Sequence, residues 1–89
     1  MICNLTFSEA IILMAAGMRL TRAGWNNKKQ YVVKFSPVAH GMEILKVDGH
    51  GEYPLCSFML LRGENMMWSV WTPSTGDTLA DDWETYHGE

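Results

Sequence analysis

Hydrophobic and polar positions near the start of the chain follow the spacing of an α-helix. The segment TFSE at residues 6–9 has the T-x-x-E spacing of a capping box, in which the Thr hydroxyl accepts from a helical amide and the Glu carboxylate returns to the cap amide. The pattern predicts a helix over residues 7–16, ended by Gly17 in a left-handed conformation. Both sides of this helix are apolar, so it must be covered on both sides, and we interpret it as part of a subunit interface.

The pattern changes to an alternation with a period of two residues from Arg19 onward. It places Leu20 on one face of a predicted strand and turns Arg19, Thr21 and Arg22 toward water or a ligand. The next residues, AGWNN, are a turn signal, and the QYVVKF that follows is rich in β-branched and aromatic residues. The two segments together predict a β-hairpin.

Two further apolar runs, SFMLLR and MMWSVW, occupy residues 57–62 and 66–71. The short loop between them suits a second hairpin, with Gly63 in a positive-φ conformation. Pro73 ends the second run because proline cannot donate to a strand ladder. A weaker apolar stretch at residues 42–47 is interpreted as one irregular strand between loops.

The last part of the chain repeats the helix-start signal. STGD at residues 74–77 has the same cap spacing and predicts a short helical turn toward Leu79, and WETY at residues 83–86 predicts a last short strand. No internal repeat or linker interrupts this plan. We therefore predict one domain, residues 1–89, of the α+β class, with one N-terminal helix packed on a mostly antiparallel sheet of about five short strands.

Charge limits the kinds of partner. The formal net charge of −3 argues against a protein that wraps a nucleic-acid polymer. No acidic residue lies between Glu9 and Glu43, a region with five Lys or Arg, whereas residues 71–89 carry five carboxylates and no Lys or Arg. A locally positive face suits a small anionic ligand, although basic side chains scattered over strand surfaces would give the same distribution.

Cysteine content and hydropathy indicate in which compartment of the cell the protein is found. Cys3 and Cys56 lie far apart and form no C-x-x-C pattern, so neither a disulfide framework nor a zinc site is indicated. The run AIILMAAGM is too short to span a bilayer and lacks the positively charged start of a signal peptide. We expect a cytoplasmic protein with no membrane partner, no metal and no cofactor.

Signals of catalysis are weak. His40, His50 and His87 are flanked by glycine or lie near the end of the chain, without the spacing of metal ligands. Asp81 and Asp82 are adjacent, so their side chains should point apart, and we interpret them as a solvated end of a helix or strand. The sequence predicts a protein that is not an enzyme.

Signals of binding are stronger in the turn that follows the first predicted strand. There the ring of Trp25 lies beside the amides of Asn26 and Asn27, which suits stacking on a flat heterocycle with hydrogen bonds to its edge. Such stacking contributes on the order of 1 to 3 kcal/mol per base. The structural alternative is that Trp25 simply packs under the turn.

The segment WTPSTGD supplies a complementary set of groups. Its predicted cap would present amides and hydroxyls to a phosphate or a ribose. The alternative is a cap that satisfies itself and only turns the chain, with Trp83 and Leu79 as core anchors. The candidate ligand-binding residues from this segment and from the first strand are Trp71, Ser74, Thr75, Asp77 and Arg22.

These two stretches together resemble a family of phage proteins. FSEAIILMAAGMRLTRAGWNNKKQYV is similar to its opening pattern, an F-x-E-A-x helix, a G-x-x-x-x-R strand and an A-G-W-N turn. WTPSTGDTLADDWE is similar to its closing pattern, W-x-P-S-x-x-D-x-L-A-x-D-W. The family is the second type of Thoeris anti-defence protein, a sponge that sequesters cyclic nucleotide immune signals. The similarity covers the two ends, roughly half of the chain.

The resemblance implies a homotetramer whose pockets, formed between subunits, hold cyclic ADP-ribose isomers such as the glycocyclic form made by bacterial TIR enzymes, without cleaving them. By position, Trp25 and Asn26 belong to the turn of the family pattern. Thr75 and Gly76 stand where larger residues are common, which leaves the choice of ligand open and includes a cyclic dinucleotide. The residues that match the closing pattern are Trp71, Ser74, Thr75 and Asp77.

Three functions from different classes follow from these observations. The first is a sponge for a cyclic nucleotide, the second is a hydrolase of the same ligand, and the third is a structural or adaptor module whose Trp residues mediate contacts between copies. Intact ligand recovered from denatured protein would favour the sponge over the hydrolase. Loss of assembly in Trp25→Ala would favour the adaptor.

Overall fold

The computed structural model describes residues 2–26, 28–36, 56–63 and 65–88. The strand expected at residues 42–47 lies outside these ranges. Helix α1 spans Phe7–Ala15 and begins with the predicted capping box, in which the N–H of Thr6 donates to Oε1 of Glu9 at 2.9 Å. Gly17 has a φ of 96°, which confirms the left-handed end of the helix.

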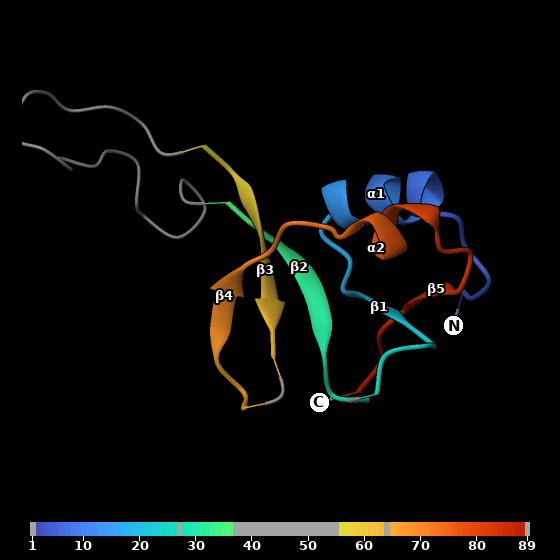
Figure 1. Ribbon diagram of the computed structural model, residues 1–89. Helices are drawn as coiled ribbons and strands as arrows, with labels where there is room; N and C mark the ends of the chain where they lie inside the picture. Colours follow the sequence, from blue (N-terminus) through green and yellow to red (C-terminus); the bar gives the residue numbers. More distant parts are fainter. Residues whose placement is uncertain (1, 27, 37–55, 64, 89) are drawn as a thin grey trace, which may run out of the picture.

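Five antiparallel strands form one sheet in the order β4-β3-β2-β1-β5 (Figure 1). Both predicted hairpins are present, β1 with β2 and β3 with β4, and β5 pairs with the other edge of β1. The sequence-based prediction of an α+β fold with an N-terminal helix on a five-stranded sheet is therefore confirmed. The strands are β1 Leu20–Arg22, β2 Tyr31–Phe35, β3 Phe58–Arg62, β4 Trp68–Val70 and β5 Trp83–Thr85.

The two helices lie on one face of the sheet (Figure 1). Beside α1 lies α2, a short helix at Thr75–Leu79. Under them Leu20, Val32 and Trp83 are fully buried, together with Met14 of α1. These side chains come from β1, β2, β5 and α1, so the core forms where the ends of the chain meet.

The other face of the sheet, called the open face below, is covered by no helix of the described residues (Figure 1). Strand register places alternate side chains there. At its β4 edge Trp68 is 51% exposed and Val70 is 66% exposed, so this face carries apolar surface that the chain itself leaves in contact with water. Side by side across the five strands lie Trp68, Arg62, Tyr31, Thr21 and Glu84, and in the next row Val70, Leu60, Val33, Arg19 and Tyr86.

The turn between β3 and β4 differs from the prediction. Gly63 does not have a positive φ, whereas Met66 has a φ of 63°. The N–H of Gly63 donates to the carbonyl of Met67 at 3.0 Å, so the loop is longer than the three residues expected and the chain reverses nearer to β4. The expectation for Gly63 was wrong because the length of the loop moved the left-handed position to Met66.

Candidate functional site

Arg22, at the end of β1, connects the two segments singled out in the sequence. Its Nε donates to Oδ1 of Asp82 at 2.8 Å, and its Nη1 donates to Oδ1 of Asp77 at 3.0 Å. Asp77 lies in α2 and Asp82 directly precedes β5. One guanidinium therefore holds β1, α2 and the start of β5 together, and two carboxylates of the same chain engage the side chain that was expected to face water or a ligand.

Asp82 also holds the turn at residues 23–26, called the AGWN turn below. Its Oδ2 accepts from the N–H of Gly24 at 2.8 Å, and its carbonyl accepts from the N–H of Ala23 at 3.0 Å. A Cβ at position 24 would lie 2.7 Å from that carboxylate oxygen, so any other residue here would push the Asp82 side chain away from the turn. The interpretation of Asp82 as a solvated carboxylate was wrong, because the pairing of β5 with β1 brings it against the turn.

These contacts shift the ionisation of both carboxyl groups. The hydrogen bond from Arg22 lowers the pKa of Asp82 below its ordinary value, against the opposing effect of partial burial. Burial acts to raise the pKa of Asp77, but hydrogen bonds from the Ser74 amide and from Arg22 outweigh it and lower the value. Both carboxylates are therefore ionised at neutral pH, and they more than balance the charge of Arg22.

Helix α2 begins with a cap whose groups satisfy one another. The N–H of Ser74 donates to Oδ2 of Asp77 at 2.9 Å, and the N–H of Asp77 donates to Oγ of Ser74 at 3.1 Å. The carbonyl of Asp77 accepts from Nε1 of Trp83 at 3.0 Å. These contacts agree with the structural alternative for this segment. Leu79, however, is 80% exposed, so its expected role as a core anchor was wrong.

Trp83 is the centre of an aromatic cluster that joins both segments. Its ring centroid lies 5.5 Å from that of Trp25 and 5.9 Å from that of Trp71, with interplanar angles of 74° and 82°. Such edge-to-face contacts are favourable for aromatic pairs. Trp71 is 9% exposed and Trp25 is half-buried, so part of the Trp25 ring remains accessible.

Most of the predicted site residues therefore meet around Trp83. Asn26 and Thr75 are exposed, and Asn27 lies outside the described residues. The residues that the structure brings together are Arg22, Trp25, Trp71, Ser74 and Asp77.

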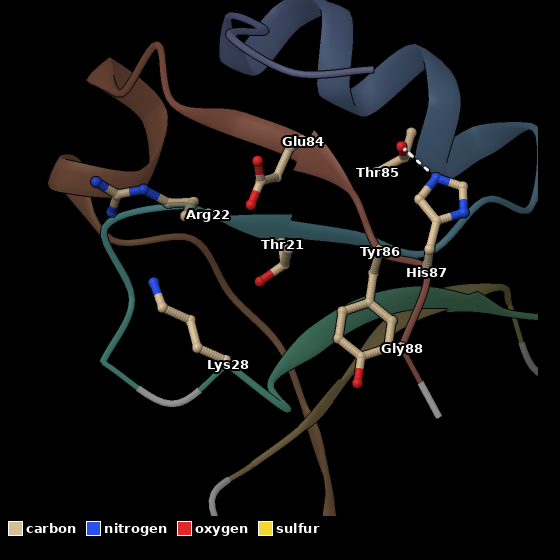
Figure 2. A pocket seen from close by; sticks show the side chains of 8 residues that line it. All are labelled: Thr21, Arg22, Lys28, Glu84, Thr85, Tyr86, His87 and Gly88. Carbon is tan, nitrogen blue, oxygen red and sulfur yellow. Dashed lines mark hydrogen bonds between the residues drawn. The ribbon is translucent and has the colours of Figure 1, made fainter. Parts of the chain in front are cut away.

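A cavity of about 260 Å³ opens beside this cluster (Figure 2). Figure 2 places Arg22 and Lys28 on one side, the Tyr86 ring and His87 on the other, and Thr21 between them. Neither Trp25 nor Trp71 lines it. The lining residues are Thr21, Arg22, Lys28, Glu84, Thr85, Tyr86, His87 and Gly88.

The polar groups of this cavity are partly engaged within the chain. The Nζ of Lys28 donates to the carbonyl of Ala23 at 2.7 Å, and the Thr85 hydroxyl is hydrogen-bonded to Nε2 of His87 at 2.8 Å. The ammonium group of Lys28 carries two further N–H donors and a positive charge at the rim. The cavity combines this ammonium group with the Glu84 carboxylate, and it is therefore suited to a polar ligand that has both anionic groups and hydroxyl donors.

Sequence reasoning missed most of this cavity. Of its lining residues, only Arg22 was predicted to bind a ligand, although Thr21 was expected to face water or a ligand. A signal for Glu84 and Tyr86 was present, because they alternate with the core residues Trp83 and Thr85 and so must point to the other face of the sheet. The identity of the neighbouring strand, which completes the cavity, could not be inferred from this alternation.

Two negative findings apply to the described parts of the chain. In these ranges, no group of three His, Cys, Asp or Glu side chains is placed to hold a metal ion. In the same ranges, no helix is both long enough and apolar enough to cross a membrane. Cys3 and Cys56 are free and exposed.

Comparisons with known proteins cover nearly the whole of this fold. The family model of the Thoeris anti-defense 2-like domain matches residues 5–86, a range that includes both helices and all five strands. Thoeris anti-defense 2 of Bacillus phage SP01 is 30% identical to the chain over 85 residues, which are 91% of this chain and 93% of that protein. The match to the family model extends across the AGWN turn, α2 and β5, and the chain therefore belongs to the Thoeris anti-defense 2-like family.

Proposed function

We propose that this protein binds a cyclic nucleotide immune signal and sequesters it without cleavage, so that the effector of the host defence is not activated. Membership of the Thoeris anti-defense 2-like family makes the chain a phage anti-defence protein. The ligand that we propose is a cyclic ADP-ribose isomer such as the glycocyclic form, with a cyclic dinucleotide as the alternative. The protein acts by binding, and its active concentration must match that of the signal.

The observation that carries this proposal is the position of the 260 Å³ cavity beside the AGWN turn. Lys28 adds positive charge at its rim, Thr21 adds a hydroxyl, and Glu84 adds a carboxylate that can accept from a ribose hydroxyl. Trp25 and Asn26 lie on the turn between Arg22 and Lys28, where a partly accessible ring and an exposed amide are suited to a base. Charge, hydroxyl acceptors and an aromatic ring are the groups that a nucleotide requires.

The size of the cavity supports a ligand shared between copies of the chain. Small-molecule sites usually enclose roughly 300 to 1,000 Å³, whereas one copy supplies about 260 Å³. The homotetramer that we propose would complete it. On a single copy Met67 is 64% exposed and Val70 is 66% exposed on or beside β4, and Ile12 is 68% exposed on α1, which is apolar surface available for assembly.

The decisive experiment is recovery of the ligand. The protein is incubated with glycocyclic ADP-ribose, separated from free ligand by gel filtration and denatured, and the released small molecule is identified by mass spectrometry. We expect intact ligand with a dissociation constant well below micromolar, equivalent to about −10 to −12 kcal/mol. A linear product would identify a hydrolase, and absence of bound ligand would exclude this proposal.

Trp25→Ala separates the sponge from an adaptor. We expect the variant to keep its assembly state in sedimentation and to lose ligand binding, because it removes the partly accessible ring of the AGWN turn while the core still holds Trp83 and Trp71. Thr78→Ala is the matched control, since this exposed side chain bonds only to the carbonyl of Thr75. Dissociation of Trp25→Ala with ligand binding retained would favour the adaptor.

A further inference from the structure

Arg19 lies on the open face between two cavities. The register of β1 with β5 places it opposite Tyr86, which lines the 260 Å³ cavity, and the register of β1 with β2 places it beside Val33. Val33 belongs to a second cavity of about 440 Å³. The walls of this second cavity are mostly apolar, and they are formed by Val33, Lys34, Phe35, Leu60 and Trp68.

The guanidinium of Arg19 lies near two tyrosine rings, and no carboxylate of the described residues pairs with it. Its central carbon lies 5.3 Å from the ring centroid of Tyr31 and 5.2 Å from that of Tyr86, within the range of cation–π contacts. Throughout the described ranges, no side chain forms an ion pair or a hydrogen bond with this guanidinium. The side chain is half-buried, so part of it remains accessible to a ligand.

The other two arginines of the sheet are engaged differently. Arg22 is bound by the carboxylates described above. Arg62 is 9% exposed, donates to the carbonyl of Lys29 and to the hydroxyl of Tyr86, and stacks 4.4 Å from the centroid of Tyr31. Arg62 thereby fixes the two tyrosine rings on which Arg19 rests. Arg62 therefore supports the rings beside Arg19, and the side-chain N–H donors of Arg19 make no hydrogen bond to any described residue.

Charges around Arg19 favour an anion. Lys28 lies at the adjoining cavity, and Glu84 lies in the neighbouring row of the open face without forming an ion pair with Arg19. The planar fork of an arginine side chain matches the oxygen atoms of a phosphate in a bidentate manner. A phosphate at this point would lie beside both cavities.

We propose that Arg19 binds the phosphate of a ligand whose flat ring occupies the 440 Å³ cavity against Trp68. The ring of Trp68 is 51% exposed and packs edge-to-face on Tyr31 at 5.8 Å, so the chain leaves part of it available for stacking. Val33 and Leu60 supply apolar walls. The inference rests on the proposed function, and it assigns one phosphate of the nucleotide to Arg19 and its aromatic base to Trp68 on the open face. In this arrangement Trp25 and Asn26 would contact another part of the ligand, or the second base of a cyclic dinucleotide.

The test uses the whole chain with two probes that differ only in the phosphate, adenosine monophosphate and adenosine. Binding is followed by NMR through the Nε resonance of Arg19 and the indole resonance of Trp68. Arg19→Gln should weaken binding of adenosine monophosphate by about 10-fold to 100-fold, as expected when a charge-assisted hydrogen bond is lost. Binding of adenosine should not change.

Lys29→Gln is the matched control, because it removes one positive charge at an exposed position of the turn before β2. It should leave the affinity for both probes unchanged. Arg19→Lys keeps the charge and loses the planar fork, and it should recover only part of the affinity for adenosine monophosphate. Thermal unfolding of each variant shows whether the fold is retained.

Equal affinity of wild type and Arg19→Gln for adenosine monophosphate would overturn this inference, as would an equal loss for both probes or no binding to the wild type. The proposed function is tested separately with glycocyclic ADP-ribose. If the phosphate dependence at Arg19 holds and the cyclic nucleotide does not bind, the anion site stands and the sponge does not. If the cyclic nucleotide binds equally well to Arg19→Gln, the sponge stands and this site does not.

Discussion

At the scale of single residues, the contact between Gly24 and Asp82 leaves no room for a side chain. A Cβ at position 24 would lie 2.7 Å from Oδ2 of Asp82 and would disturb the hydrogen bond that this oxygen accepts from the Gly24 amide. We expect Gly24→Ala to lower the free energy of unfolding by about 1 to 3 kcal/mol, the usual cost of forcing an atom into a filled site. Urea denaturation followed by tryptophan fluorescence measures this change in the free energy of unfolding.

Gly76 supplies the matched control for this substitution. A Cβ there would meet only Oγ of Ser74, at 3.7 Å, which is an ordinary contact. Because Gly76 lies inside α2, alanine should raise the free energy of unfolding by up to about 1 kcal/mol. Similar effects of the two substitutions would show that the contact with Asp82 does not restrict position 24.

At the scale of the elements, Arg22 and its two carboxylates join β1, α2 and the start of β5, and this junction should respond to acid. The pKa values of Asp77 and Asp82 are lowered by folding, so their contribution to stability is complete above the ordinary value of 3.8 and is lost as the pH falls through the lower folded values. We expect the free energy of unfolding to fall below about pH 4.

Asp82→Asn identifies the source of that pH dependence. The variant should lose about 1 to 2 kcal/mol at pH 7, typical of a hydrogen bond to a charged group, and its stability should decline less steeply in acid. The pKa of Glu9 is also lowered, chiefly by the backbone hydrogen bond from Thr6. Because Glu9 is present in the wild type and in Asp82→Asn, its effect on stability is the same in both and does not alter the difference between them. An unchanged acid response in Asp82→Asn would show that the junction does not control it.

The elements differ in how far the sequence predicts them. Helix α1 and both hairpins were predicted because their signals lie within a few residues, such as the Thr6 and Glu9 cap. The pairing of β5 with β1 joins residues far apart in the chain, and the hydrogen bond from Arg22 to Asp82 spans 60 positions. Periodicity specifies which face a side chain takes, but it does not specify the neighbouring strand, so the 260 Å³ cavity could not be predicted.

At the scale of the whole molecule, we propose that copies of the chain meet through the exposed apolar side chains near β4. We expect the wild type to sediment as a multiple of its 10.1 kDa mass. Val70→Lys should shift it toward the single chain, because Val70 is 66% exposed on the edge strand and a buried charge opposes association. Analytical ultracentrifugation measures both.

Leu79 is the matched position for this test. It is 80% exposed, but it lies on α2, away from the β4 edge. Leu79→Lys should leave the sedimenting mass unchanged. Loss of association in Leu79→Lys but not in Val70→Lys would place the contact on the helical layer, where Ile12 of α1 is also exposed.

The position of β1 inside the sheet affects how the chain folds during translation. This strand is translated early, yet it lies between β2 and β5, and β5 leaves the ribosome after all the other described strands. Until then, α1 and β1 lack Trp83, the largest fully buried side chain of the core. The nascent chain therefore carries its apolar helix uncovered through most of translation, and we expect molecular chaperones to bind it there.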